Sequence, residues 1–324
     1  MEPIAYPSLT CPFPSAINPH ATEAQHATIT WARRFRLLQR DAAYRRLNRL
    51  QYGMLMARAY PSAATETLQI VTDWSTWLFL LDDQCDEAGL GHDPEQLARL
   101  HTQFLAVLQG IPPGKDSGPL VYGLWDLHTR ILAHAPEGWQ ARFCRSVREY
   151  FTANVWEATN RRQRHIPDAD SYCAMRLFTS AVYPCLLLIE LTEGLHLPSE
   201  VYDHPDVQHL SKMANNVISW SNDIVSLEKE LRQGDVHNLA LILSHEQNLS
   251  LQTAVDRVSA LHDAEVYAFI ALARRLPSFT PAVDAELQCY VSGLRFWMRA
   301  NLDWSLGTVR YQSIPEISAE PVLA

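Results

Sequence analysis

Three acidic residues stand at the end of an otherwise apolar helical segment. Asp82, Asp83 and Asp86 follow the apolar run 77–81, and helical spacing keeps Asp82 and Asp86 on the inward face of that segment. Carboxylates on an inward face repel each other and resist loss of water, so they stay ionised there only where cations share the site. Oxygen ligands without His or Cys favour Mg²⁺. A solvated acidic helix end explains the same residues, and for this motif alone that alternative stays open.

A second group of oxygen-bearing side chains lies on one face of the segment 204–232. Asn222, Ser226 and Glu230 are spaced four residues apart, so in a helix they form a column about 12 Å long. Residues 213–227 include no Lys, Arg or Glu, although exposed helix faces usually carry these good helix formers. The pattern predicts a second Mg²⁺ site, and a water-facing surface is the alternative.

A metal site without a nucleotide loop suggests a phosphate ligand that is held by side chains. Arg offers a planar fork for phosphate, Lys a point charge and Tyr a hydroxyl donor, although each is also common on protein surfaces. The candidate donors are Arg176, Lys229, Arg310 and Tyr311. The basic run 161–164 is expected to be a solvated helix end.

The elements that position these residues are expected to be helices, because a period of 3.6 residues dominates the chain after residue 21. Five prolines among the first twenty residues indicate an extended arm. The predicted helical segments are 22–58 (dividing near Asp41), 66–87, 94–109, 119–134, 139–165, 169–193, 204–232, 238–246, 251–275 and 282–306. The pattern predicts an all-α protein with an arm at 1–21, one helical domain at 22–312 and a tail at 313–324.

Composition excludes several classes of function. The chain has 324 residues with 27 Lys and Arg against 36 Asp and Glu, a net charge of −9 that argues against nucleic acid as the partner. Neither GxGxxG nor GxxxxGK[ST] occurs, so nucleotide binding by those loops is not expected. The six cysteines have no CxxC spacing, the first residues do not form a secretory signal, and no apolar run is long enough for a membrane span. A cytoplasmic protein is the expectation.

Together the motifs resemble the bacterial class I terpene synthase family over nearly the whole chain. Residues 82–86 have the form DDxxD, residues 222–230 have the form NDxxSxxKE, and residues 310–311 match the Arg-Tyr pair that follows the last helix. The N-terminal segment 11–19 also matches. Arg176 stands where the family places its pyrophosphate-sensing arginine. The resemblance implies a single-domain helical bundle around a central active-site cavity.

The resemblance also implies an activity and a cofactor. The family ionises an isoprenyl diphosphate and cyclises the carbocation to a terpene hydrocarbon or alcohol plus pyrophosphate. Members of this size most often use farnesyl diphosphate, as sesquiterpene synthases, while geranyl and geranylgeranyl diphosphate stay open. Three Mg²⁺ ions, or Mn²⁺ as a substitute, are implied, with Asp82 and Asp86 as ligands on one side and Asn222, Ser226 and Glu230 on the other.

Further roles follow from the same resemblance. The diphosphate would be bound by the four candidate donors, and Thr179 and Ser180 fall at the linker and effector positions of a helix break. Aromatic rings facing the cavity would stabilise the carbocation. The candidates are Phe79 and Trp304, with Trp77, Phe178 and Tyr183 as weaker ones. Dimers are common in the family, so a homodimer is an open expectation.

The chain departs from the family pattern at two positions. Leu177 follows the sensor arginine where many relatives carry a second arginine, and Ser180 stands where glycine is frequent. The shape of the helix break therefore does not follow from the motif.

Two other functions compete with cyclisation. A chain-elongating prenyl diphosphate synthase is also helical and uses Mg²⁺, but it needs a second DDxxD where this chain has the residues 222–226. A non-catalytic helical binding module predicts ordinary charged faces, and the segment 213–227 argues against it.

Overall fold

The computed structural model of the protein describes residues 4–86, 89–136 and 138–311. The side chain of Asp86 and the predicted tail at 313–324 lie outside the described part of the chain. The division into arm, domain and tail stays a prediction.

The described residues form α-helices and one short 3-10 helix (η1), and no strand is found among them. The elements are α1 (Ala21–Arg34), α2 (Asp41–Leu50), α3 (Tyr52–Ala59), α4 (Thr65–Asp86), η1 (Leu90–His92), α5 (Pro94–Leu108), α6 (Pro119–His134), α7 (Trp139–Gln163), α8 (Ala169–Thr179), α9 (Val182–Glu193), α10 (Ser199–Tyr202), α11 (Pro205–Gln233), α12 (Leu239–Glu246), α13 (Leu251–Ala273) and α14 (Pro281–Gly307). The all-α prediction is confirmed.

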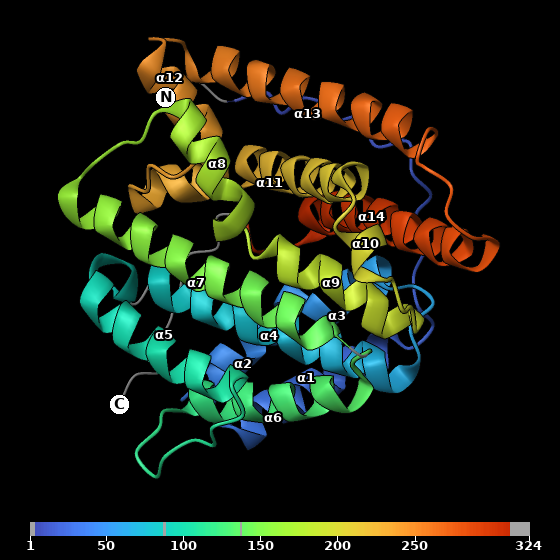
Figure 1. Ribbon diagram of the computed structural model, residues 1–324. Helices are drawn as coiled ribbons and strands as arrows, with labels where there is room; N and C mark the ends of the chain where they lie inside the picture. Colours follow the sequence, from blue (N-terminus) through green and yellow to red (C-terminus); the bar gives the residue numbers. More distant parts are fainter. Residues whose placement is uncertain (1–3, 87–88, 137, 312–324) are drawn as a thin grey trace.

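An inner set of helices is covered by an outer set (Figure 1). α11 packs against α14, which also contacts α3 and α9, and α4 packs against α3 and α9. Outside them, α13 covers α11, while α5 and α6 cover α7 and α4. The inner helices carry every predicted ligand and donor except Arg176, which lies on α8, and the Arg-Tyr pair, which follows α14.

Most helix ends agree closely with the predicted segments, and the exceptions are the segments 22–58 and 169–193 and the short elements η1 and α10. The segment 22–58 is broken twice, between α1 and α2 and again at Gln51, whose φ of 58° and ψ of 45° are left-handed. The prediction of one division near Asp41 was therefore incomplete. The short helix α10 was not predicted, because four residues are too few to show a helical period.

The segment 169–193 is two helices. Ala181 has φ 56° and ψ 15°, a left-handed conformation that is unfavourable for a residue with a Cβ atom, and it separates α8 from α9. Pro184 lies in the first turn of α9, where the missing N–H is not needed. Ala169–Glu193 is long and apolar enough to cross a membrane by length and composition alone. In this fold α9 is instead buried by its neighbours.

The N-terminal arm runs in extended form along α13 and α14. The Thr10 hydroxyl donates to Asp263 at 2.8 Å, and the Ser15 hydroxyl donates to Asp303 at 2.6 Å. The Phe13 ring is buried and packs edge-on against Phe269. The arm therefore ties α13 to α14 on the outside of the inner helices.

Candidate active site

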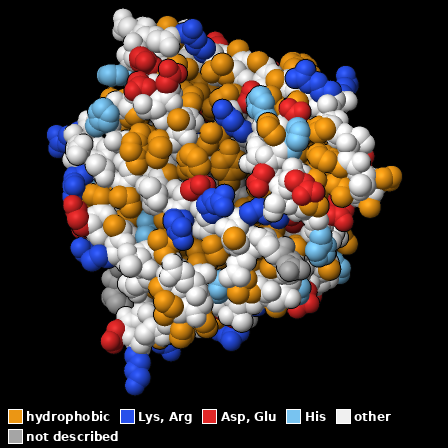
Figure 2. All heavy atoms as spheres, viewed as in Figure 1, with side chains coloured by type: hydrophobic (Ala, Val, Ile, Leu, Met, Phe, Trp, Pro, Cys, Tyr) orange, Lys and Arg blue, Asp and Glu red, His pale blue; other side chains and the backbone are white. Residues whose placement is uncertain are grey.

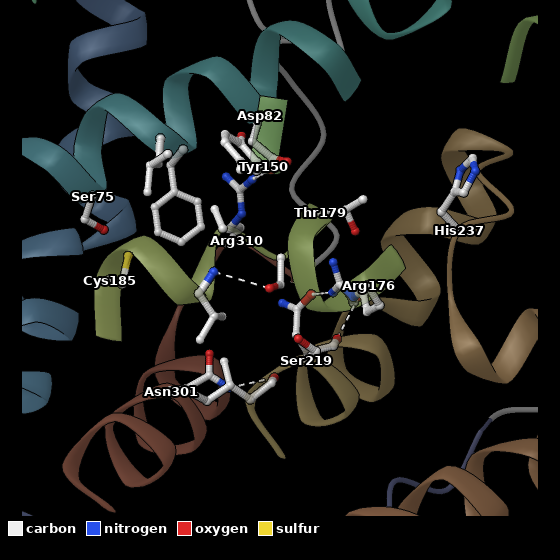
Figure 3. A pocket seen from close by; sticks show the side chains of 18 of the residues that line it. Ser75, Asp82, Tyr150, Arg176, Thr179, Cys185, Ser219, His237, Asn301 and Arg310 are labelled. Atoms are coloured by element: carbon white, nitrogen blue, oxygen red, sulfur yellow. Dashed lines mark hydrogen bonds and ion pairs between the residues drawn. The ribbon is translucent and has the colours of Figure 1, made fainter. Parts of the chain in front are cut away.

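A pocket opens between the inner helices, and residues from both predicted ligand motifs line it. Its lining comes from α3, α4, α7, α8, α9, α11 and α14 and from the residues that follow α14. Apolar side chains such as Leu78, Ile218 and Trp297 form one part, and polar side chains form the other. Asp82 with Arg310 and Arg176 lie around the same cavity (Figure 3). On the face shown in Figure 2, hydrophobic side chains gather in a hollow with acidic and basic side chains along its edge.

The first wall of the pocket is the C-terminal end of α4. Nη2 of Arg310 donates to Asp82 at 2.7 Å, and Nη1 donates to Asp83 at 2.9 Å. The Arg310 side chain is only 3% exposed, whereas that of Asp82 is 48% exposed. Burial favours the neutral form of Arg310, but the carboxylates of Asp83 and Asp82 outweigh it and keep its pKa well above the usual value. The motif therefore faces the pocket through Asp82, while the buried Asp83 holds Arg310 in place.

Arg310 packs against a cluster of three aromatic rings. The ring of Phe79 stacks on that of Tyr52 with a centroid distance of 4.1 Å, and Trp304 lies 5.6 Å from Phe79. The Arg310 guanidinium lies 4.8 Å from the Phe79 ring centroid, a cation–π contact. The Tyr52 hydroxyl also accepts a hydrogen bond from Arg310 at 2.9 Å. Phe79 and Trp304 line the pocket; the role of Tyr52 was not predicted, since nothing in the sequence links it to Phe79.

The second wall is α11. Nδ2 of Asn222 donates to the Tyr311 hydroxyl at 2.7 Å, and Nη2 of Arg176 donates to Oδ1 of Asn222 at 2.8 Å. Arg176 also binds Asp223 through Nε at 3.1 Å. The predicted sensor arginine, the first residue of the second motif and the C-terminal tyrosine are thus linked in one chain of hydrogen bonds.

Asp223 is the fully buried centre of this network. Its second carboxylate oxygen accepts from the Tyr172 hydroxyl at 2.8 Å and from the Leu239 amide at 3.1 Å. Burial raises its pKa, and Arg176 opposes the increase. No role was predicted for Asp223, although it lies on the same helical face as the apolar residues Trp220 and Leu227, and a carboxylate on such a face is a sign of a buried ion pair.

Ser226 and Glu230 continue the column along α11, and both line the pocket. The Ser226 hydroxyl donates to the Asn222 carbonyl at 2.7 Å, so its oxygen lone pairs remain available as a ligand. Burial, together with the nearby carboxylates of Asp223 and Asp235, raises the pKa of Glu230 to about 8. A cation beside Glu230 would offset this effect.

The donor set therefore fits a hard divalent cation. Asp82, Asn222, Ser226 and Glu230 offer oxygen atoms only, and Glu230 lies among carboxylates whose repulsion a metal ion would relieve. No group of three His, Cys, Asp or Glu residues that could hold a metal occurs in the part of the chain that the structure describes. A site with so few carboxylates is typical of an ion whose coordination is completed by substrate phosphates and water.

The break between α8 and α9 borders the same pocket. Thr179 and Ser180 line it, but the left-handed residue is Ala181, one position after the predicted effector. Asn215 on α11 stabilises the break: Nδ2 donates to the Leu177 carbonyl at 2.7 Å, and Oδ1 accepts from the Ser180 hydroxyl at 3.0 Å. The left-handed Ala181 could not be expected from the sequence, because alanine rarely adopts positive φ.

Of the remaining predicted site residues, some line the pocket and others lie outside it. Lys229 lines the pocket. Trp77 does not: it is fully buried, donates to the Leu120 carbonyl at 2.9 Å and packs edge-on against Phe104, so its prediction as a cavity aromatic is corrected. Phe178 and Tyr183 pack against each other with ring centroids 6.0 Å apart, and neither lines the pocket, so their prediction as weaker cavity aromatics is also corrected.

The prediction of a solvated helix end for the basic run 161–164, at the C-terminal end of α7, was only partly correct. Arg162 and Arg164 are exposed, as predicted, but the Arg161 side chain is only 11% exposed and lines the pocket. It donates to Asp235 through Nη2 at 2.7 Å and through Nε at 3.1 Å. A partner 74 residues away in the chain gives no local signal, so Arg161 could not be separated from its neighbours in the sequence.

Known proteins with the same features are terpene synthases. Residues 73–267 match the family model described as terpene synthase family 2, C-terminal metal binding. The chain is 48% identical to (+)-T-muurolol synthase of Roseiflexus castenholzii, covering 94% of this chain and 93% of that one. It is 38% identical to 10-epi-cubebol synthase of Sorangium cellulosum, over 94% and 97% of the two chains.

Solved structures agree with the sequence matches. Germacradien-4-ol synthase from Streptomyces citricolor aligns with a TM-score of 0.83 and 28% identity, covering 93% of this chain and 99% of that one. An ancestral reconstruction named SVS_A2 aligns with a TM-score of 0.86 and 27% identity over 97% and 93% of the chains. The fold, both ligand motifs and the full-length similarity agree, and the chain belongs to the terpene synthase family.

Proposed function

We propose that the protein ionises farnesyl diphosphate and cyclises the carbocation to a sesquiterpene hydrocarbon or alcohol, with release of pyrophosphate. One observation carries the proposal: the adjacent residues Arg310 and Tyr311 bind the two opposite walls, at Asp82 and at Asn222. The name of the Roseiflexus castenholzii relative specifies farnesyl diphosphate, which supports this substrate. The relatives are named for different products, so the product does not follow from similarity.

Ionisation requires neutralisation of the charge that develops on the leaving diphosphate. Arg176, Lys229, Arg310 and Tyr311 place cations and a hydroxyl around one pocket. In this structure Arg310 pairs with Asp82, and Arg176 pairs with Asn222 and Asp223. The diphosphate oxygens offer these donors a second set of acceptors, so substrate binding draws α8, α11 and the residues after α14 toward α4.

We propose that Mg²⁺ is the cofactor and that three ions bind, with Mn²⁺ as a substitute. When bound, Mg²⁺ supplies positive charge to the diphosphate oxygens and weakens the bond to carbon. Asp82 and Asp86 would hold two ions and Asn222, Ser226 and Glu230 the third.

The hydrocarbon part of the substrate would occupy the apolar part of the pocket. The ring face of Trp304 can stabilise a carbocation, and Phe79, which stacks on Tyr52 and lies under the Arg310 guanidinium, shapes the wall beside it. The nearby Leu55 and Val182 exclude water. We propose that the released pyrophosphate acts as the final base, because the apolar wall offers no strong one.

Two experiments test the proposed function. Incubation with geranyl, farnesyl and geranylgeranyl diphosphate and Mg²⁺, followed by gas chromatography, is expected to give cyclic products from farnesyl diphosphate. A second incubation adds isopentenyl diphosphate. Formation of longer diphosphates as products would instead indicate chain elongation. Thermal unfolding with Mg²⁺ and inorganic pyrophosphate is expected to show a rise in Tm that needs both, whereas no shift favours a non-catalytic module.

The homodimer and the cytoplasmic location stay predictions. Light scattering after size-exclusion chromatography measures the mass directly, and a value near the 36.8 kDa of one chain would exclude a stable dimer.

A further inference from the structure

The orientation of the Glu230 carboxylate depends on a residue outside both ligand motifs. Oε2 of Glu230 accepts a hydrogen bond from Nδ2 of Asn238 at 2.6 Å. Glu230 is near the end of α11, and Asn238 precedes α12, so the contact spans the connection between the two helices.

The Asn238 amide is held in one orientation. Its side chain is fully buried, and Oδ1 accepts from the backbone amides of Ala240 at 2.9 Å and Leu241 at 3.4 Å, as the N-cap of α12. Because Oδ1 must face these amides, Nδ2 must face the other way. There it donates to the Asp223 carbonyl at 2.6 Å as well as to Glu230.

The segment that carries Asn238 is itself fixed from across the pocket. Oδ1 of Asp235 accepts from the Val236 amide at 2.7 Å and from the His237 amide at 3.1 Å. Its other oxygen accepts from Arg161 of α7, and Nδ1 of His237 lies 2.9 Å from Oδ1. These contacts outweigh the effect of burial and lower the pKa of Asp235, which therefore stays a carboxylate.

We propose that Asn238 is a positioning residue that holds the Glu230 carboxylate in the orientation in which it binds the metal ion. The Arg161–Asp235 ion pair serves the same end, since it anchors the segment 234–238 to α7. The inference rests on the proposed function and adds a residue that acts on the metal only through Glu230. Residues that orient metal ligands typically change metal affinity by about 10- to 100-fold when they are replaced.

The two duties of Asn238 can be separated by substitution. Asn238→Asp and Asn238→Ser keep an oxygen that caps α12 and remove the amide donor to Glu230. Ser250→Ala is the matched control, because Ser250 caps α13 by accepting from the Thr253 amide at 3.1 Å and is not among the residues that line the pocket. The readout is the Mg²⁺ concentration that gives half of the Tm shift at fixed inorganic pyrophosphate, with no substrate present.

We expect this concentration to rise at least tenfold in Asn238→Asp and Asn238→Ser and to stay unchanged in Ser250→Ala. Steady-state kinetics should show the same shift in Mg²⁺ dependence, with kcat largely recovered at high Mg²⁺ in Asn238→Ser. A Mg²⁺ dependence equal to that of the wild type in both Asn238 variants overturns the inference. If the Asn238 variants fail to fold, the same measurement is made on Arg161→Gln. A Mg²⁺ dependence of Arg161→Gln equal to that of the wild type also overturns the inference. If the wild-type protein shows neither a Tm shift with Mg²⁺ and pyrophosphate nor turnover, the proposed function is contradicted instead.

Discussion

The Tyr311 hydroxyl lies 2.7 Å from Nδ2 of Asn222, while the preceding residue, Arg310, binds Asp82 on the opposite wall of the pocket. Two consecutive residues thus connect the two ligand motifs, which are 140 positions apart in the chain (222 − 82). A change at either residue should act on both walls.

Tyr311→Phe removes only the hydroxyl of this link. The same hydroxyl is the proposed donor to the diphosphate, and loss of that hydrogen bond, about 1.4 kcal/mol, predicts a KM for farnesyl diphosphate about tenfold higher, with the fold retained. Tyr122→Phe is the control, since the exposed Tyr122 hydroxyl bonds only to the nearby Gly114 carbonyl among the described contacts. Equal KM values for wild type and Tyr311→Phe would show that the hydroxyl does not contribute to binding.

Asp82→Ala and Glu230→Gln are each expected to abolish turnover with little change in Tm. Both substitutions remove a proposed metal ligand at the pocket and leave the apolar core intact, and Arg310 keeps its contact with Asp83 in Asp82→Ala. Product formation by gas chromatography and circular dichroism measure the two effects. Glu66→Gln, at a side chain that is 77% exposed, should behave as the wild type. Normal product formation by either ligand variant at ordinary Mg²⁺ would refute the assignment.

Phe79 and Trp77 lie two residues apart and should respond differently. Phe79→Ala opens the pocket wall, so an altered mixture of products is expected. Trp77→Ala leaves a cavity in the core and should lower the free energy of unfolding by about 3–5 kcal/mol without changing the mixture. Denaturant unfolding and gas chromatography separate the effects; an unchanged product profile for Phe79→Ala would remove Phe79 from the cavity wall.

Acid sensitivity should depend on His101. This residue is buried and stacks on Phe151 at 4.4 Å, and burial lowers its pKa from 6.5 to about 3. Between these values the unfolded chain binds a proton that the folded chain does not, so the stability present above pH 6.5 is lost as the pH falls. From pH 6.5 to 5 the loss is about 2 kcal/mol.

His101→Leu is expected to remove that part of the pH dependence, measured by denaturant unfolding at several pH values. His245→Gln, at an exposed position, is the control. If His101→Leu loses as much stability as the wild type between pH 6.5 and 5, another group is responsible.

Much of the fold and of the site could be predicted because the signals are local. The helical period gave the bounds of α6 without error, and the spacing of Asn222, Ser226 and Glu230 placed them on one face of α11. A residue's type and its neighbours three or four positions away are sufficient for such predictions. The family resemblance supplied the predicted roles of Arg176, Arg310 and Tyr311, which stay predictions.

The residues that were missed or misplaced are those whose role depends on distant partners. Asp82 and Asp83 are the same residue type, but only Asp83 is buried. Arg161 and Arg162 differ in burial and in partner, since Arg161 pairs with Asp235 and the more exposed Arg162 pairs with Glu95. Trp77 and Phe79 are equally aromatic, but only one faces the pocket.

The sequence by itself determined the helices, the ligand types and their order along the chain, because these follow from local periodicity and side-chain chemistry. Only the tertiary structure decided which carboxylate faces the pocket, how Tyr52 supports Phe79, and that Asn238 contacts Glu230. The physical reason is that burial and hydrogen-bond partners depend on packing between helices, which no short stretch of sequence specifies.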